Sequence, residues 1–170
     1  MPTAGDATNW IKQQPMFSEL SSTEQNEAGS FTFICTIFEL NVIQVLEKDS
    51  ANSSLGRLTC REYAQSHHLP ENDLSAEKAY FRNHFFDRDG QDQSTWASAL
   101  FRPSDHKDEI KEILLNTNTT AMEDAEALIR IVVRLRNNYF HGFKWAYNMK
   151  GQLDNFVHAN SVLVKVMPNV

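Results

Sequence analysis

The chain has 170 residues, 41% of them hydrophobic, and a formal net charge of −6. A chain of this size can bury one core but is short for two domains, so we expect a single domain. The net negative charge excludes a whole surface that binds nucleic acid without regard to sequence, because such binding depends on neutralising phosphates. If RNA is the substrate, the positive charge must be local.

Residues 1–20 are polar, contain Pro2 and Pro15, and carry Trp10 as a large anchor. We predict a polar N-terminal arm over residues 1–20 and a single helical domain over residues 21–170. The first residues show no basic segment followed by an apolar one, which argues against a secretory signal. The sequence therefore favours a cytoplasmic location.

The most apolar stretch, residues 31–46, is interrupted by polar side chains, whereas a membrane-spanning helix needs roughly 20 mostly apolar residues. The capping-box pattern Ser21-x-x-Glu24 precedes it, so we predict a long core helix and no membrane partner. Cys35 in this helix is expected to be a buried free thiol, and the environment of Cys60 stays open. The spacing of the two cysteines supports neither a zinc site nor a disulfide framework.

Three shorter helices are predicted before the last third of the chain. The first must end before Pro70, the second runs to a turn at Gly90, and the third carries Ile110 and Leu114 on one face. A loop with a helical fragment is expected between Gly90 and Pro103. The expected caps are Thr59 of the pair Thr59-x-x-Glu62, then Asn72 or Asp73, then Ser104 or Asp105.

Two further helices complete the predicted fold. The capping box Thr120-x-x-Glu123 begins a helix that runs to about His141, and a closing helix ends at Pro168. The apolar positions of the closing helix are Leu153, Phe156, Val157, Leu163 and Val164. The sequence shows no convincing strand pair, so it predicts an all-α compact bundle of about five to six helices.

The helix after Thr120 has an apolar side and a basic side. Leu128, Ile131, Val132 and Leu135 form the apolar stripe. Arg130, Arg134, Asn137 and His141 follow one another at spacings of four, three and four, with Lys144 a further three residues on. The alternative to a nucleic-acid interface is an ordinary solvated basic face, paired with Glu123, Asp124 or Glu126.

Arg136 lies among apolar positions of the same helix, so its guanidinium requires a partner. That partner is either a carboxylate elsewhere in the chain or a group of another molecule. His141, in the last turn, can serve as a proton donor and acceptor near neutral pH, because its ordinary pKa is about 6.5. Alternatively, His141 stabilises the helix C-terminus, where Gly142 suits a cap.

The segment Arg136-Asn137-Asn138-Tyr139-Phe140-His141 resembles the RNxxxH form of the Arg-x4-6-His motif of the HEPN superfamily. The preceding helix, the following Gly142-Phe143-Lys144 and the short closing helix are similar to that family as well. The resemblance is specific over about residues 123–166 and extends only to helical architecture before them. It implies a HEPN-like bundle that forms a homodimer, in which two copies of the motif face each other in a composite active site.

The resemblance further implies metal-independent RNA cleavage, in which the ribose 2'-hydroxyl attacks the adjacent phosphate and leaves 2',3'-cyclic phosphate and 5'-hydroxyl ends. His141 would transfer protons, Arg136 would hold the phosphate, and Asn137 would have a supporting role. Arg130, Arg134 and Lys144 would bind the RNA backbone. No cofactor or metal is expected, and the family suggests a role as a toxin or in phage defence, with an antitoxin or regulator as a possible partner.

One position departs from a known subfamily. Toxins of the Arg-x4-His-x-Tyr type are inactivated by AMPylation of the tyrosine, and here that position is Phe143. The same mode of control therefore lacks its acceptor hydroxyl. Two other readings stay open: a non-catalytic HEPN-like module that binds a nucleotide, RNA or a protein, and a dimerisation or regulatory protein in which the motif is structural.

Overall fold

The structure is a computed structural model that describes residues 4–47, 55–66, 73–99, 101–140 and 151–167. Within these ranges the regular secondary structure is helical, which confirms the predicted all-α class. The helices are α1 Ala4–Lys12, α2 Pro15–Ser18, α3 Ser22–Val45, α4 Arg57–Ser66, α5 Ser75–Phe85, α6 Ser94–Ser98, α7 Lys107–Leu115, α8 Ala121–Phe140 and α9 Leu153–Val166, with a 3-10 helix at Pro103–Asp105.

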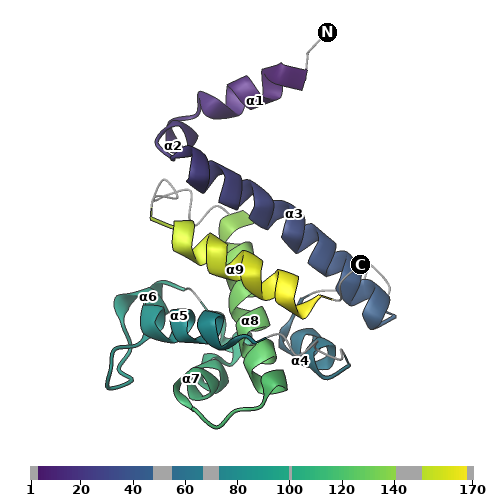
Figure 1. Ribbon diagram of the computed structural model, residues 1–170, viewed down its shortest axis with the longest axis vertical. Coiled ribbons are helices and arrows are strands. Elements are labelled where there is room, and N and C mark those ends of the chain that lie inside the picture. The colour runs from purple at the N-terminus through teal and green to yellow at the C-terminus, as the bar shows by residue number, and fades with distance from the viewer. Residues whose placement is uncertain (1–3, 48–54, 67–72, 100, 141–150, 168–170) are drawn as a thin grey trace.

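The six main helices correspond to the five to six that the sequence predicts: α3, α4, α5, α7, α8 and α9. The others are short. α6 is the helical fragment expected between Gly90 and Pro103, while α1 and α2 form the N-terminal arm, and α1 projects away from the bundle (Figure 1).

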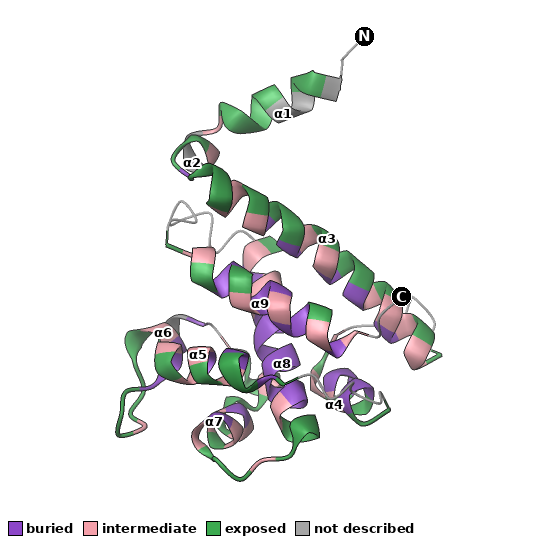
Figure 2. Cartoon of the chain, in the orientation of Figure 1, coloured by how far each residue is buried: buried purple, intermediate pink, exposed green. Residues whose placement is uncertain are grey.

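Helix α8 runs through the middle of the bundle (Figure 1), with α4, α7 and α9 packed against it and α3 packed against α9. Its predicted apolar stripe is confirmed, since Leu128, Ile131 and Val132 are buried. The remaining sides are covered as well: every residue from 125 to 134 is buried, as the purple colouring of α8 shows (Figure 2). A helix surrounded in this way has no solvated face over most of its length.

Two of the three predicted capping boxes form. The Ser21 amide donates to the Glu24 carboxylate at 2.8 Å, and the Glu24 amide donates to the Ser21 hydroxyl at 3.2 Å. Thr120 and Glu123 make the same reciprocal pair at the start of α8, at 2.7 and 3.2 Å. Each pair satisfies backbone donors that have no partner within the helix.

The other predicted helix starts need correction. α4 begins at Arg57, so Thr59 lies inside the helix and is buried rather than capping it. Ser104 and Asp105 lie in the 3-10 helix, and α7 starts after His106, whose φ of 47° is left-handed. Asp73 does accept a hydrogen bond from the Ser75 amide, although the residue directly before α5 is Leu74.

Helix α3 carries apolar residues on more than one side, but only one side faces the bundle. Ala28, Phe31, Cys35, Phe38 and Val42 are buried, as expected for a core helix. On the outward side Phe33, Ile37 and Leu40 are exposed, Phe33 by 74%. We call these three residues the α3 stripe; Figure 2 shows the outer side of α3 mainly in green.

Of the described helices, α3 is the one whose length and composition would allow it to cross a membrane, and it also contributes five buried residues to the core. A core helix passes the same criterion. The closing helix α9 packs through Phe156, Leu163 and Val166, whereas Val157 and Val164, predicted on its apolar side, are exposed.

Candidate functional site

The Arg136–His141 segment falls at the C-terminal end of α8, whose last described residue is Phe140. Arg136 and Asn137 lie on the last turns and are half-buried, while Asn138 is fully buried. His141 and Lys144, which the sequence assigns to catalysis and to RNA binding, lie outside the described residues. Of the two residues that the sequence assigns to catalysis, Arg136 is therefore the one that the structure describes.

Arg136 is held from three sides. Its Nη2 lies 2.5 Å from Glu39 Oε1, its Nη1 donates to Asn137 Oδ1 at 3.1 Å, and its guanidinium carbon lies 5.0 Å from the centre of the Phe140 ring. Its Nε is buried and has no hydrogen-bond partner among the described residues. Both members of the Glu39 pair are partly exposed, at 29% and 33% of the side chain.

Glu39 is the in-chain carboxylate that one reading of the sequence requires for Arg136. It comes from α3, far away in the sequence, and no motif of the chain marks it. A pair that is about one third exposed contributes at most about 1 kcal/mol, so an incoming phosphate can compete with the carboxylate for the guanidinium.

Arg136 and Asn137 open into a pocket of about 490 Å³. Its walls come from α3, from the start of α4, from the 3-10 helix and from α8, elements that are distant in the sequence. We call it the arginine pocket. It is lined by Glu39, Ile43, Leu55, Gly56, Arg57, Arg102, Ser104, Asp105, Arg134, Arg136 and Asn137.

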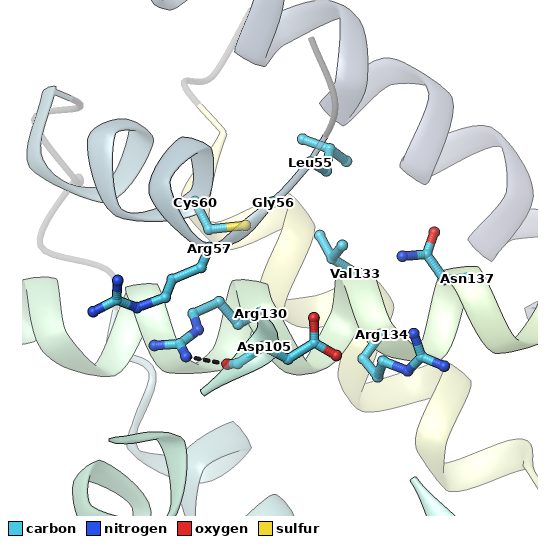
Figure 3. A pocket seen from close by; sticks show the side chains of 9 residues that line it. All are labelled: Leu55, Gly56, Arg57, Cys60, Asp105, Arg130, Val133, Arg134 and Asn137. Carbon is cyan, nitrogen blue, oxygen red and sulfur yellow. Dashed lines mark hydrogen bonds between the residues drawn. The ribbon is translucent and has the colours of Figure 1, made fainter. Parts of the chain in front are cut away.

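The lining of the arginine pocket contains four guanidinium groups and two carboxylates, so its formal charge is positive in a chain with a net charge of −6. This supplies the local positive charge that an RNA substrate would demand. Figure 3 shows a smaller neighbouring pocket of about 30 Å³, which Arg130 also lines and which shares Leu55, Gly56, Arg57, Asp105, Arg134 and Asn137 with the arginine pocket. Asp105 lies between Arg130 and Arg134 in that view.

Arg130 differs from the predicted picture of a basic face. Its side chain is 4% exposed and its Nη1 lies 3.1 Å from both Glu109 and Glu126. Its Nη2 donates to the backbone oxygens of Asp105 and His106. The side of α8 that carries Arg130 is covered by α4 and α7, so this arginine is an internal cation rather than a solvated one.

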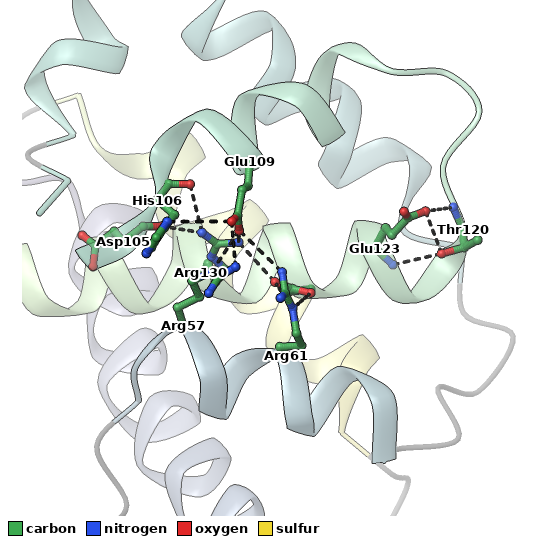
Figure 4. Close-up of polar contacts among 9 residues, drawn as sticks. Arg57, Arg61, Asp105, His106, Glu109, Thr120, Glu123 and Arg130 are labelled. Carbon is green, nitrogen blue, oxygen red and sulfur yellow. Dashed lines mark hydrogen bonds and ion pairs between the residues drawn. The ribbon is translucent and has the colours of Figure 1, made fainter. Parts of the chain in front are cut away.

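The carboxylates around Arg130 also receive arginines from α4 (Figure 4). Arg57 binds Glu109 through Nε at 2.9 Å and Nη2 at 2.7 Å, and Arg61 Nε lies 3.0 Å from Glu126 Oε2. Hydrogen bonds from Arg57 and Arg130 lower the pKa of Glu109, against the effect of its burial. We call Arg57, Arg61, Glu109, Glu126 and Arg130 the ionic cluster; Arg130 and Glu126 are its buried members.

Arg134 is also buried, but it lies on the wall of the arginine pocket. Its Nη2 donates to Asn138 Oδ1 at 2.6 Å and its Nε to the carbonyl oxygen of Ala99 at 3.4 Å. Burial lowers the pKa of Arg134; Asp105 opposes this change and the nearby charge of Arg102 adds to it. Arg134 is thus fixed by neutral partners and keeps its positive charge beside the pocket.

The sequence missed Glu39, Arg57, Arg102, Ser104 and Asp105 as pocket residues. Arg57 follows Gly56 and Arg102 precedes Pro103, so the sequence places both arginines at turns of the chain. This position is the one sequence feature that could have marked them as pocket residues. Arginines at turns are common on protein surfaces. Their convergence depends on how α4 and the 3-10 helix pack against α8, which no local pattern encodes.

Both cysteines are buried, which confirms the prediction for Cys35 and decides the open question of Cys60. Burial raises the pKa of each thiol to about 12. Because the thiolate is the nucleophilic form, neither cysteine is a candidate nucleophile in this state. Among the described residues no three His, Cys, Asp or Glu side chains are arranged to hold a metal ion.

In comparisons with models of protein families, with curated proteins and with solved structures, no match to this chain was found. The resemblance to the HEPN superfamily therefore rests on the Arg136–His141 segment and its neighbouring residues.

Proposed function

We propose that this chain is a metal-independent endoribonuclease of the HEPN type, in which Arg136 and His141 act on RNA. The observation that carries the proposal is the placement of Arg136 and Asn137, from the RNxxxH segment, on the wall of a positively charged pocket. Positive charge at the motif is what a phosphate substrate requires, and the acidic remainder of the chain does not provide it.

In the proposed reaction the 2'-oxygen of a ribose bonds to the adjacent phosphorus and gives up its proton. The bond from phosphorus to the 5'-oxygen breaks, and that oxygen takes up a proton, which leaves 2',3'-cyclic phosphate and 5'-hydroxyl ends. His141 transfers the protons and Arg136 stabilises the charge that develops on the phosphate oxygens. DNA lacks the attacking hydroxyl and is not cleaved.

Arg136 suits the phosphate because its planar fork presents two donors and is charged at every physiological pH. Glu39 holds the fork in the free chain, and its carboxylate stands where a phosphate oxygen would bind. Asn137, which accepts from Arg136 at 3.1 Å, keeps the predicted supporting role as a positioning residue. The hydrogen bond from Arg134 to Asn138 ties together the preceding turn of the same helix.

The proposal includes a homodimer that brings two motifs into one composite site. The α3 stripe supports it, because three large apolar side chains at helical spacing are exposed on the outward side of the helix that carries Glu39. Surfaces of this kind mark contacts between proteins. A toxin or phage-defence role in the cytoplasm, held in check by an antitoxin or another regulator, completes the proposal from the HEPN resemblance.

A second candidate is a non-catalytic module that binds RNA, a nucleotide or a protein at the same pocket. The ion pair between Arg136 and Glu39 favours it, since that pair gives the motif arginine a partner without any substrate. The two candidates share the pocket and differ only in the chemistry at His141.

The deciding experiment is incubation of total bacterial RNA with purified protein in EDTA, followed by analysis of the product ends. His141→Ala and Arg136→Ala are expected to abolish cleavage, whereas His158→Ala, which changes a histidine of α9, should cleave like the wild type. Cyclic-phosphate ends from the wild type alone support the nuclease. Equal cleavage by wild type and His141→Ala, or RNA binding without cleavage, supports the binding module.

The homodimer has its own test. Replacing Phe33 and Ile37 of the α3 stripe by Glu should convert a dimer to a monomer in light scattering, because two buried charges oppose association. Replacing exposed Val157 and Val164 of α9 by Glu is the matched control and should leave the mass unchanged. A wild type that is monomeric at all concentrations contradicts the dimer.

A further inference from the structure

Two arginines of the pocket, Arg102 and Arg134, have no ion pair among the described residues, and Arg102 is the exposed one of the two. It precedes the 3-10 helix, and its backbone amide donates to the Asp105 carboxylate at 2.6 Å, while its side chain is exposed. The other three have fixed partners: Arg57 binds Glu109, Arg134 binds Asn138, and Arg136 binds Glu39.

Arg102 is exposed, but it lies beside a second cation of the pocket, the buried Arg134. Burial lowers the pKa of Arg134, the charge of Asp105 opposes this change, and the charge of Arg102 adds to it. Two guanidinium groups that repel each other at one wall favour a bound anion between them. The neighbouring Ser104 adds a hydroxyl donor to the same wall.

The site is built on fixed elements. Arg57 is bound through two nitrogens to Glu109, so the start of α4 is tied to α7, and the carbonyl oxygens of Asp105 and His106 both accept from the buried Arg130. The 3-10 helix, which contains Ser104 and directly follows Arg102, is thereby attached to α8. A ligand that meets donors held in place loses less free energy to ordering them.

We infer that Arg102 and Ser104 form a second phosphate subsite, which binds the backbone of a single RNA strand beside the phosphate held by Arg136. This inference rests on the proposed function, since it names where the strand continues once its scissile phosphate is at Arg136. Asn137 lines the same pocket and contacts Arg136. The contact is to the backbone, so it carries no base preference.

The test uses a strand that cannot be cleaved. A fluorescent deoxythymidine oligonucleotide lacks the 2'-hydroxyl, and its binding is followed by anisotropy at several salt concentrations. Arg102→Gln should weaken binding by about 3–10-fold at low salt and reduce the slope of log K against log[salt] by about 0.7, the value for one lost phosphate contact on a single strand. Ser104→Ala should weaken binding by about 2–3-fold with the slope unchanged.

Arg88→Gln is the matched control, because Arg88 is equally exposed, carries the same charge and lies on the turn after α5, outside the pocket lining. Arg102→Gln and Arg88→Gln with the same affinity and slope overturn the subsite. So does a wild type that binds no oligonucleotide at low salt. Inorganic phosphate that binds Arg102 more tightly than the strand does, measured by competition, overturns the assignment to a strand.

The outcome is separate from that of the nuclease. A changed slope for Arg102→Gln together with no RNA cleavage by the wild type keeps the subsite and rejects the nuclease. Cleavage by the wild type together with an unchanged slope keeps the nuclease and rejects the subsite.

Discussion

Arg130 and Arg136 lie on the same helix and have opposite relations to their surroundings. Arg130 is closed in by Glu109, Glu126 and two backbone carbonyl oxygens, and its side chain is 4% exposed. Arg136 has one carboxylate partner and faces the arginine pocket. The first arrangement leaves no room for a ligand, and the second does. Whether an arginine of α8 can bind a ligand therefore depends on the space around its guanidinium and not on the residue type.

The largest expected effect on stability is at Arg130, the enclosed arginine. Arg130→Ala removes the most buried cation of the cluster, while Arg57 and Arg61 still bind Glu109 and Glu126, so we expect the free energy of unfolding to fall by about 2–3 kcal/mol. Urea denaturation measures the loss. Arg102→Ala, on the open side, should change stability by no more than about 0.5 kcal/mol. Equal losses in the two variants would contradict the comparison.

The second effect is a pH dependence. The pKa of Glu109 in the folded chain is lowered, chiefly by the hydrogen bond from Arg57, from the ordinary value of 4.5. Its stabilising contribution is complete above that value and is lost as the pH falls through it and through the lower folded pKa. The partly exposed carboxylate limits the contribution to about 1 kcal/mol.

Thermal unfolding between pH 7 and pH 3 measures this dependence. Glu109→Gln should flatten the acid side of the profile, whereas Glu112→Gln, which changes an exposed residue of the same helix, should reproduce the wild-type profile. If the profiles of the wild type and Glu109→Gln are parallel, the ionic cluster does not cause the pH dependence.

The smallest effect on stability is expected at Glu39. Glu39→Gln removes a partly exposed pair, so stability should change by less than about 1 kcal/mol. Binding of the deoxythymidine oligonucleotide should strengthen by about 2–5-fold, because the carboxylate no longer competes for Arg136. Glu47→Gln, which changes an exposed residue just after the end of α3, is the control. Weaker binding by Glu39→Gln would show that Glu39 positions Arg136 for the ligand.

Periodicity correctly predicted one side of α8 and misjudged the other. The spacing of Leu128, Ile131 and Val132 identified the side that packs against the core. The same spacing put Arg130 and Arg134 on an opposite, solvated side, because a helical wheel contains no information on how many neighbours a helix has. α8 is covered by α4 and α7 as well. Arg130 is buried with Glu109 of α7 as a partner, and Arg134 is buried with the carbonyl oxygen of Ala99 and with Asn138 of α8 itself.

The caps show how far local chemistry predicts structure. Ser21 and Thr120 each form the box that their sequence indicates, since the interaction is complete within three residues. Thr59 has the same pattern but is buried inside α4, where tertiary packing starts the helix at Arg57. The candidate site was predictable to the same extent: Arg136 and Asn137 from the motif, but not Glu39, whose proximity to them arises only from the packing of α3.

α3 packs against α9, a helix that is synthesised much later than α3 itself. α3 leaves the ribosome early, and the helix that it packs against is translated roughly 5–20 s later at ordinary rates of synthesis. During that interval the side containing Phe31 and Phe38 has no α9 to cover it, and the α3 stripe is exposed as well. A nascent chain of this protein thus presents an apolar helix on two sides, which makes it a natural client for chaperones that hold unfinished chains.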